Sequence, residues 1–577
     1  MSYEKEQAHL RRLLEEVDSD LEDVDDEESD GEENIVEFQL SDTDTEQEAE
    51  SDVEDLAGPA PKPSRVPTFL GKDGTVWKKH RPPQTVRTRK SNLVTHLPGP
   101  KTYAKNAKSI DDCWSLFFSN DILNLIVQYT NQHINSVKDK FARERSTRET
   151  DLVEIKAVLG LLYLAGVLKS NRLNVDELWE RDGSGIELFW LTMSKQRFLF
   201  LIRHLRFDDS TTRTERKVSD KLAPIRDVFT IFADNCQKSY TISEYATIDE
   251  KLEGFRGRCA FKQYIPSKPN KYGLKVFALV DAKTKYTLTL EPYVGLQPEG
   301  LYRKNNDPAS IVLRLIAPIS GSGRNVTCDN WFTSFNLIAT LREKHNLTYV
   351  GTVRKNKKEL PLEFVNTKTR PVASSMFGFQ EGTTIVSYIP KKYKNVILAS
   401  SMHHDDTIDP ATGEKYKPEI ITFYNGTKGG VDTVDELCST YNVARNTRRW
   451  PMVLFYSIMN MAGINGQIIY MANNPNSNLV RRKFLKQLAV KLADEHLKRR
   501  SLTKNVPVAV RERRQEVAGT SADVPKGNPE TPRVKKRCHL CTKDSKTRYF
   551  CKFCKKFLCL SHAEFGCPNC LRNVEEP

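Results

Sequence analysis

The chain has 577 residues and a mass of 66.0 kDa, which predicts roughly four structural units and a sizeable buried core. Its formal net charge of +13 conceals an asymmetry, because residues 1–60 contain 24 Asp and Glu against only Lys5, Arg11 and Arg12. This arm carries −21, so the other 517 residues carry +34. A body of that charge favours a polyanionic partner.

The composition argues against a membrane protein and against a secreted one. The mean hydropathy is −0.54, and apolar stretches such as 157–168 fall short of the roughly 20 residues that span a bilayer. The first residues lack the apolar segment of a secretory signal, so we expect no disulfides. Five scattered cysteines are therefore expected to be reduced core thiols, namely Cys113, Cys236, Cys259, Cys328 and Cys438.

The N-terminal arm, residues 1–60, is rich in Asp, Glu and Ser and poor in aromatic residues, which predicts disorder. An acidophilic kinase would find suitable sites at Ser19, Ser29, Ser41 and Thr43. A solvated tail that masks the basic body is the simpler interpretation. Residues 61–108 have the composition of a basic, Pro-containing linker, suited to phosphate contact or to nuclear import.

Hydrophobic periodicity divides the middle of the chain into a helical part and a mixed part. Residues 109–244 have apolar positions at helical spacing and are predicted to form a helical domain. Within residues 245–355, three extended runs are followed by a helix, a strand, a second helix and a last strand. This βββαβαβ order is expected of a ribonuclease-H-like core, a mixed sheet flanked by helices.

The pattern breaks after Arg354. Residues 356–424 are predicted to be a β-rich insertion, with strand-like runs TTIVSYI, NVILASS and EIITFYN. The core is expected to return at 425–450, followed by a second helical part at 451–500 and a basic linker at 501–536.

The C-terminal residues 537–577 contain the pattern C-x2-C-x9-C-x2-C-x4-C-x2-H-x4-C-x2-C. Eight ligands in four close pairs predict two tetrahedral Zn²⁺ sites, which also supply folding energy to a segment with little core. The interleaved assignment places Cys538, Cys541, Cys559 and His562 on one ion and Cys551, Cys554, Cys567 and Cys570 on the other. Cross-braced folds of this type also bind proteins, but the many nearby Lys and Arg favour DNA.

Three aspartates fall where a ribonuclease-H-like sheet would gather them. Asp249 ends the first strand, Asp329 ends the fourth, and Asp432 begins a later helix. The first and fourth strands of such a sheet are neighbours, so the carboxylates would converge. They could hold two Mg²⁺ or Mn²⁺ ions for phosphoryl transfer. Aspartate is also common at strand ends and helix caps for purely structural reasons.

Longer motifs strengthen the catalytic interpretation. These motifs are IDEKLEGFRGRCAFKQYIPSKPNKYGLKVFALVDAKTKY, VTCDNWFTS, YNGTKGGVDTVDELCSTYNVARNTRRWPMVLFY and the Cys/His tail. Together they closely resemble the piggyBac family of cut-and-paste DNA transposases over about residues 110–577, and the acidic arm is also of the family's type. The resemblance implies a ribonuclease-H-like core with an insertion, surrounded by a helical dimerisation and DNA-binding domain.

The same resemblance assigns roles to the acidic residues. Asp249, Asp329 and Asp432 are expected to be the catalytic aspartates, and Asp435 is a fourth acidic residue that could approach the metals or orient a ligand. In the family's chemistry, metal-activated water nicks the transposon end, and the freed 3′ hydroxyl forms a hairpin on the opposite strand. The hairpin is then opened and the 3′ ends join a TTAA target.

The expected DNA contacts lie close to the first and third aspartates. They are Arg256, Arg258, Arg445, Arg448, Arg449 and Trp450. Guanidiniums grip phosphate, and an indole can stack on an unpaired base near a hairpin tip. Trp450 could equally anchor the core, and surface charge explains Lys268 and Lys271 as well as DNA contact does.

Three functions are compatible with these features. The first is an active transposase that binds double-stranded DNA at terminal inverted repeats, as a homodimer in the nucleus and without a membrane. The second is a domesticated descendant that binds DNA without cutting it. The third is a zinc-dependent protein binder such as a ubiquitin ligase. The intact aspartates, zinc ligands and RRWPM motif favour the first, and the third leaves the nuclease-like chain without a role.

Overall fold

The computed structural model describes residues 36–38, 67–82, 94, 96–141, 147–266, 268, 270–502, 508–517, 535–542, 546–550 and 556–562. The chain divides into two compact units, residues 1–497 and 498–577. Most of the acidic arm, and with it the predicted disorder, lies outside the described residues. The part that is described, Val36–Phe38, forms a short strand, β1.

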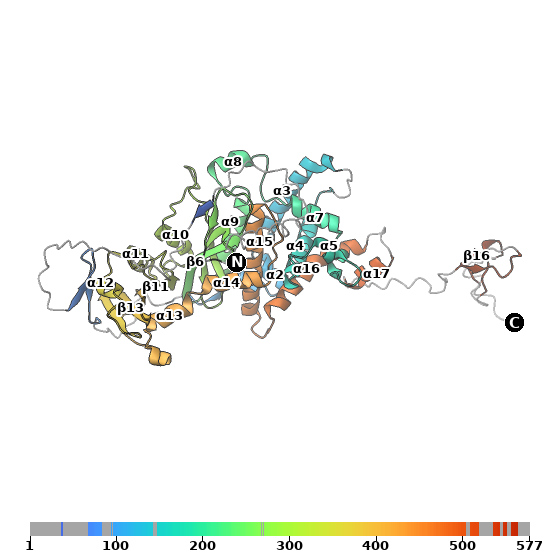
Figure 1. Ribbon diagram of the computed structural model, residues 1–577. Helices are drawn as coiled ribbons and strands as arrows, with labels where there is room; N and C mark the ends of the chain where they lie inside the picture. The colour runs from blue at the N-terminus through green and yellow to red at the C-terminus, as the bar shows by residue number, and fades with distance from the viewer. Residues whose placement is uncertain are drawn as a thin grey trace, which may run out of the picture. The chain divides into compact units, whose positions relative to one another are not determined.

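The larger unit is built on a mixed sheet whose central strands follow the predicted order (Figure 1). The elements, in chain order, are β6 (Tyr245–Gly254), β7 (Lys262–Tyr264), β8 (Tyr272–Asp281), β9 (Thr287–Pro292), α10 (Pro308–Leu315), β10 (Asn325–Cys328), α11 (Phe335–His345) and β11 (Thr348–Thr352). Antiparallel pairing joins β6 to β8 and β8 to β9, whereas β10 is parallel to both β6 and β11. The predicted first and fourth strands, β6 and β10, are therefore direct neighbours. At the opposite edge, β1 pairs in parallel with β7.

The insertion continues this sheet beyond β11. It consists of α12 (Leu362–Val365), β12 (Ser375–Gln380), β13 (Thr383–Lys391), β14 (Lys394–Ser400) and α13 (Glu419–Thr427). The strand order β11-β14-β13-β12 is antiparallel throughout. The expectation that EIITFYN forms a strand was wrong, because this run is the helix α13. A short apolar run fits either structure, and the helical start signal here is Pro418 followed by Glu419.

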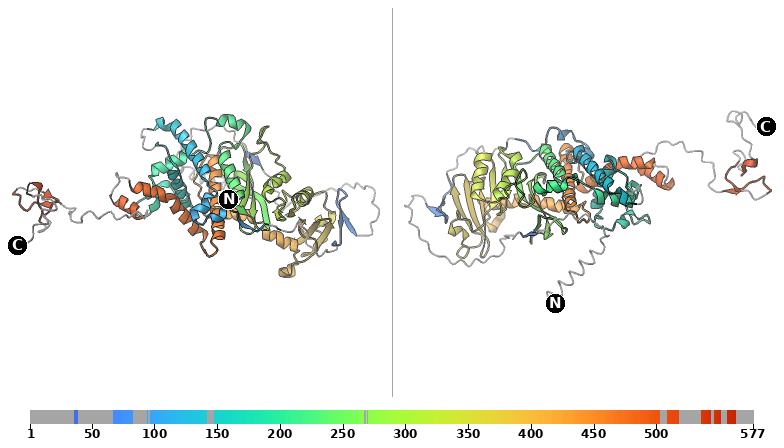
Figure 2. Two further views of the ribbon diagram at one scale, coloured as in Figure 1. Left: turned by 180° about the vertical axis from the view of Figure 1, so that it is seen from behind. Right: turned by 90° about the horizontal axis from the view of Figure 1, so that it is seen from above.

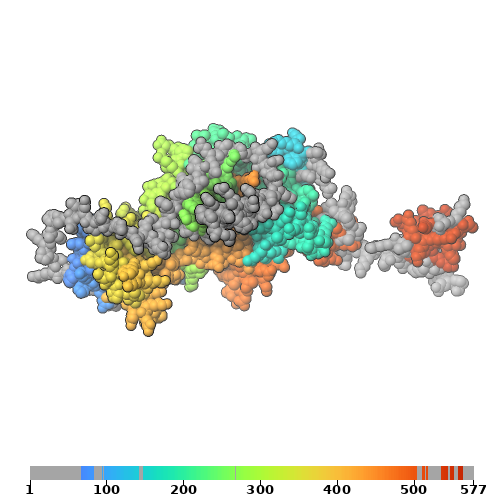
Figure 3. Space-filling model, viewed as in Figure 1, coloured from blue at the N-terminus to red at the C-terminus, as the bar shows by residue number. Residues whose placement is uncertain are grey.

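Part of the expected basic linker forms a hairpin on the edge of the insertion. Its strands are β2 (Thr68–Leu70) and β3 (Val76–Lys78), and β3 pairs with β12 through Lys78 and Phe379. Trp77 is fully buried, and its indole Nε1 donates to the carbonyl oxygen of Glu359 at 2.9 Å. The space-filling view shows the blue hairpin against the yellow insertion (Figure 3).

The helical part is assembled from segments that precede and follow the sheet in the chain, and it includes the small strand pair β4 and β5. Its elements are β4 (Gly99–Pro100), α2 (Ile110–Ser115), α3 (Asn120–Val137), α4 (Leu152–Val167), α5 (Val175–Trp179), α6 (Glu187–Thr192), α7 (Lys195–His204), α8 (Arg213–Ser219), α9 (Arg226–Ser239), β5 (Tyr240–Thr241), α14 (Gly430–Thr440), α15 (Trp450–Asn473) and α16 (Arg481–Ser501). Figure 2 shows the cyan and teal helices beside the orange ones. The Tyr163 hydroxyl on α4 donates to the Met459 carbonyl oxygen on α15 at 2.6 Å, and a Cβ on Gly160 would lie 2.6 Å from the Ala489 carbonyl oxygen. Residues some 300 positions apart therefore share one core.

Helix α15 is the central helix of this core. It is long and apolar enough to cross a membrane, but 83% of its most apolar window is buried within the protein. Such burial is typical of a core helix in a globular protein. Asn465 ties it to the sheet, because its side chain donates to the Thr287 carbonyl oxygen at 2.9 Å and accepts from the Thr287 N–H at 3.0 Å. The five scattered cysteines are all buried and free, as predicted.

The smaller unit contains α17 (Val508–Val517) and the antiparallel pair β15 (Lys536–Arg537) and β16 (Lys546–Thr547). This unit also holds the first of the predicted zinc clusters.

Candidate active site and metal centre

Asp249 and Asp329 directly follow the last paired residues of two neighbouring parallel strands. The expectation that Asp249 ends its strand was wrong, because β6 continues to Gly254, whereas Asp329 does follow the last residue of β10. Ile248 on β6 pairs in register with Cys328 on β10, and each aspartate is the next residue along the chain. Burial and the carboxylates of Glu250 and Asp329 raise the pKa of Asp249 well above its ordinary value. Burial and the Glu250 carboxylate likewise raise the pKa of Asp329 to about 6. The site therefore concentrates negative charge that a cation can relieve.

Glu250 is a site residue that the sequence analysis missed, although it directly follows Asp249 in the motif IDE. Among the described residues, its Oε2 is one of the buried polar atoms that have no hydrogen-bond partner. Crowded carboxylates with an unsatisfied oxygen fit a hard divalent cation such as Mg²⁺ or Mn²⁺, which selects oxygen ligands.

Asp432 reaches the site because helix α14 begins unusually close to strand β6. A Cβ on Gly430 would lie 2.4 Å from the Thr247 Oγ1, so only glycine permits this approach. The Thr247 hydroxyl also donates to the Thr427 carbonyl oxygen at 2.6 Å, which holds the end of α13 against the same strand. The Asp432 side chain is 66% exposed and lies on the open side of the site, 3.6 Å from the Lys268 ammonium.

Lys268 belongs to the site and is not simple surface charge. Its Nζ donates to the Glu250 carbonyl oxygen at 3.2 Å. Burial lowers its pKa, but the carboxylates of Asp249, Glu250 and Asp432 outweigh burial and raise it. The lysine is thus a cation among the acidic groups.

Asp435 is engaged differently from the other three aspartates. Its Oδ1 accepts a hydrogen bond from the buried Lys251 ammonium at 2.5 Å, and its side chain is 33% exposed. In the described part of the chain, the aspartates do not form a group whose ligand atoms all lie within 4.8 Å of one another; only the cysteine and histidine cluster of the smaller unit does. The structure therefore gathers Asp249 and Asp329, with Asp432 more open and Asp435 ion-paired.

Two segments with expected DNA contacts converge at one glycine. Arg256 and Arg258 are exposed on the loop after β6, and Gly257 lies between them. A Cβ on Gly257 would lie 2.7 Å from the carbonyl oxygen of Arg448, whose side chain is also exposed. These three arginines therefore present positive charge together.

Arg445, Arg449 and Trp450 make contacts within the protein. Arg445 donates to the Asn171 carbonyl oxygen at 2.9 Å, and Arg449 donates to the carbonyl oxygens of Arg203 and Leu205 at 2.9 and 2.6 Å. The two hydrogen bonds of Arg449 cap the C-terminal end of α7. Trp450 is buried, and its ring lies 5.0 Å from that of Phe261. These contacts favour the alternative interpretation of Trp450 as a residue that anchors the core.

A basic hollow of about 400 Å³ lies where β11 leads into the insertion. Its lining residues are Asp73, Arg354, Asn356, Lys357, Lys358 and Glu359. Arg354 also acts on the candidate site, because its charge opposes the rise in the pKa of Asp329. The sequence shows only a Lys-rich stretch here, since Asp73 arrives from the distant hairpin.

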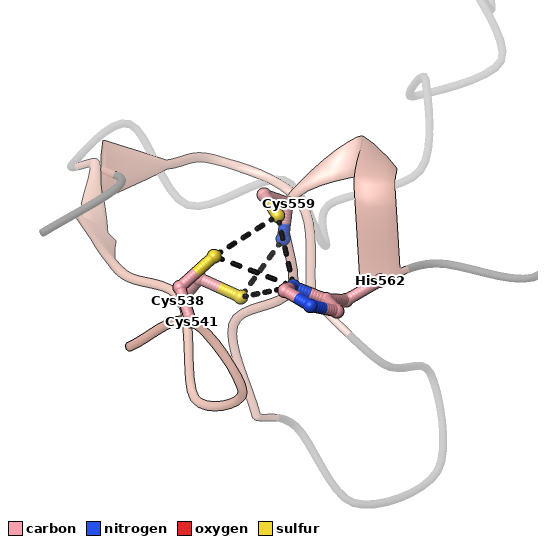
Figure 4. A group of neighbouring side chains, drawn as sticks. All are labelled: Cys538, Cys541, Cys559 and His562. Carbon is pink, nitrogen blue, oxygen red and sulfur yellow. Dashed lines mark hydrogen bonds between the residues drawn. The ribbon is translucent and has the colours of Figure 1, made fainter. Parts of the chain in front are cut away.

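In the smaller unit, the four residues assigned to one zinc ion lie together (Figure 4). The sulfur atoms of Cys541 and Cys559 are 3.4 Å apart, and the Nδ1 of His562 is 3.3 Å from each of them and 3.7 Å from the sulfur of Cys538. Zn–S and Zn–N bonds of about 2.3 and 2.0 Å give tetrahedral edges of about 3.5–3.8 Å. The donor set and its spacing therefore fit Zn²⁺. The second predicted set, Cys551, Cys554, Cys567 and Cys570, lies outside the described residues.

Comparisons with known proteins agree on one family. Residues 111–467, more than half of the chain, match the family model described as Transposase IS4. The human PiggyBac transposable element-derived protein 3 is 25% identical over 351 residues, covering 58% of this chain and 56% of that protein. The human PiggyBac transposable element-derived protein 5 is 21% identical over 392 residues, covering 64% and 72%. The chain thus spans about half the length of the first of these relatives.

A solved structure gives a fuller match. The cryo-EM structure described as the piggyBac transposase synaptic complex with hairpin DNA superposes with a TM-score of 0.70 and 36% sequence identity. The match covers 82% of this chain and 100% of that one. With the mixed sheet and the paired aspartates, these matches show that the chain belongs to the piggyBac family of transposases.

Proposed function

We propose that the protein is a cut-and-paste DNA transposase that acts through a ribonuclease-H-like core. It would bind the terminal inverted repeats of its element, excise the element through 3′-hydroxyl nicks and hairpin intermediates, and join the ends to TTAA targets. The observation that carries this proposal is the pair Asp249 and Asp329, each held directly after the last paired residue of two adjacent parallel strands, beside Asp432. The strand order β9-β8-β6-β10-β11 supports the assignment of the core.

The residues that would hold two divalent cations are Asp249, Asp329 and Asp432. Bound Mg²⁺ or Mn²⁺ would stabilise the charge on the attacking and leaving oxygens of each phosphodiester exchange. The chain itself contributes the fixed strand register that sets the first two carboxylates, and the Gly430 contact that brings α14 to the sheet. Each step of transposition is an in-line attack on phosphorus, so one such site can serve all of them in turn.

The surrounding positive groups would bind and orient the DNA. The exposed side chains of Arg256, Arg258 and Arg448 are suited to phosphate contact, which is strong and independent of base sequence. The zinc cluster would hold the smaller unit folded to bind the inverted repeat. The solved relative is described as a synaptic complex with hairpin DNA, which supports a hairpin route. The protein would act in the nucleus as a homodimer that holds two ends.

The second candidate is a domesticated DNA-binding protein without cleavage activity. It is favoured by the names of the human relatives, which are described as derived from transposable elements. The acidic residues of the site argue for the active enzyme, because cleavage is the function that needs several carboxylates close together.

A cellular excision assay distinguishes these candidates. The protein is expressed with a plasmid that carries a marker between the inverted repeats found beside its gene, each flanked by TTAA, and the donor junctions are sequenced. We expect donor sites restored to a single TTAA with wild-type protein and none with Asp329→Asn. Binding of the repeats without any excision would favour the domesticated protein.

A further inference from the structure

Lys251 is a fully buried lysine that links the strand and the helix of the proposed active site. It lies two residues after Asp249 on β6, so both side chains are on the same face of the strand. Its side chain is 1% exposed, and its Nζ is 2.5 Å from the Asp435 Oδ1 and 3.5 Å from the Glu253 Oε1. The Asp435 partner belongs to α14, three residues after Asp432.

The same network reaches a third element. Glu253, also on β6, accepts a hydrogen bond from the Ser457 hydroxyl on α15 at 2.6 Å. The ammonium of Lys251 therefore lies at the junction of the catalytic strand, the helix of the third aspartate and the central core helix.

A buried ion pair is a poor way to gain stability alone, because an apolar pair of similar volume usually serves as well or better. Its best use is to fix one arrangement of the groups that it joins. Here the joined elements are β6, which carries Asp249, and α14, which carries Asp432.

We infer that Lys251 is a positioning residue that anchors helix α14 through Asp435, and that Asp435 acts as this anchor instead of as a metal ligand. One carboxylate oxygen of Asp435 is committed to the ammonium. The anchor sets the position of Asp432 relative to Asp249 across the metal site. This inference rests on the proposed function, since it assumes that Asp249, Asp329 and Asp432 bind divalent cations.

The test is a double-mutant cycle on the full-length, zinc-loaded protein, with Mn²⁺ binding measured by calorimetry and thermal unfolding measured in parallel. The variants are Lys251→Met, Asp435→Asn and the double substitution. The matched control is Arg197→Met, which breaks a buried ion pair with Glu154 in the helical part, where the two groups are 2.7 Å apart.

We expect each single substitution at the pair to weaken Mn²⁺ binding by about tenfold, the size of effect that the partners of metal ligands produce. The double variant should bind no more weakly than either single variant, because both remove the same anchor. Arg197→Met should lower the unfolding temperature but leave Mn²⁺ affinity unchanged, which separates positioning from a general loss of stability.

Two results would overturn the inference. One is a Lys251→Met variant that binds Mn²⁺ like the wild type. The other is an Asp435→Asn variant that loses Mn²⁺ binding altogether while Lys251→Met retains it, which would make Asp435 a ligand. An Asp249→Asn variant that binds Mn²⁺ as tightly as the wild type would instead contradict the proposed function.

Discussion

Asp249 and Asp329 are adjacent across the sheet because Ile248 and Cys328, the residues before them, are registered partners in parallel strands. The register alone sets this relationship, and a slip of one residue would turn one carboxylate to the other face. The cost is electrostatic, since burial and neighbouring carboxylates raise the pKa of both side chains.

The first prediction concerns the pH dependence of metal binding. Only the ionised carboxylates bind a cation, so Mn²⁺ affinity should fall as the pH drops through about 6, where Asp329 gains a proton. Glu250→Gln removes a negative charge that raises this pKa, so the midpoint should move to lower pH. Calorimetric titrations between pH 5 and pH 8 measure both. A midpoint that stays in place or moves upward in the variant would contradict the electrostatic account.

The second prediction concerns stability without metal. A carboxyl whose pKa is higher in the folded state favours folding most below its unfolded pKa, and this advantage is lost as the pH rises through the folded value of about 6. Asp329→Asn should therefore raise the unfolding temperature of the metal-free protein by a few degrees at pH 7.5, and the difference should vanish towards pH 4. Differential scanning calorimetry in EDTA tests this, with the exposed Asp234→Asn as control. A variant less stable than the wild type at pH 7.5 would refute it.

The third prediction concerns zinc. Cys541→Ser or His562→Ala removes one ligand of the described cluster and should lower the zinc content by about one ion per chain, as measured by atomic emission. Specific binding of the inverted repeat should fall about a hundredfold, whereas the unfolding transition of the larger unit should not change. Repeat binding that survives the loss of zinc would show that the smaller unit does not recognise DNA.

The fourth prediction separates two neighbouring arginines. Arg448→Ala should reduce the slope of log affinity against log salt by about one, as expected for one lost phosphate contact. Arg449 donates to the carbonyl oxygens of Arg203 and Leu205, so Arg449→Ala should lower the unfolding temperature and leave the salt slope unchanged. Equal losses of salt slope in both variants would show that Arg449 also contacts DNA.

The sequence predicted the core well because its signals are local. The extended runs of the sheet and the helical segments before β10 and β11 can be identified without knowledge of their partners. Asp249 and Asp329 could be predicted as neighbours because the strand order of such a sheet is known. EIITFYN failed because a short apolar run has no decisive period.

Contacts between distant segments could not be predicted. Trp77 is buried by Glu359 and its neighbours, 282 residues away, and the sequence around it has the composition of a linker. Lys251 and Asp435 are separated by 184 residues, so nothing in either motif indicates an ion pair. The same holds for Arg449. It belongs to an arginine-rich motif suited to phosphate binding, but its side chain caps a distant helix.

The most direct test of the central claim is strand cleavage by the purified protein. A duplex carrying the inverted repeat flanked by TTAA is incubated with Mg²⁺ and the wild type, Asp249→Asn or Asp329→Asn, and the products are separated on a denaturing gel. We predict nicked and hairpin products with the wild type, and a loss of at least about a thousandfold in rate with either variant. Cleavage that persists in both variants, or a wild type that binds the duplex and Mg²⁺ but never cuts, would contradict the account.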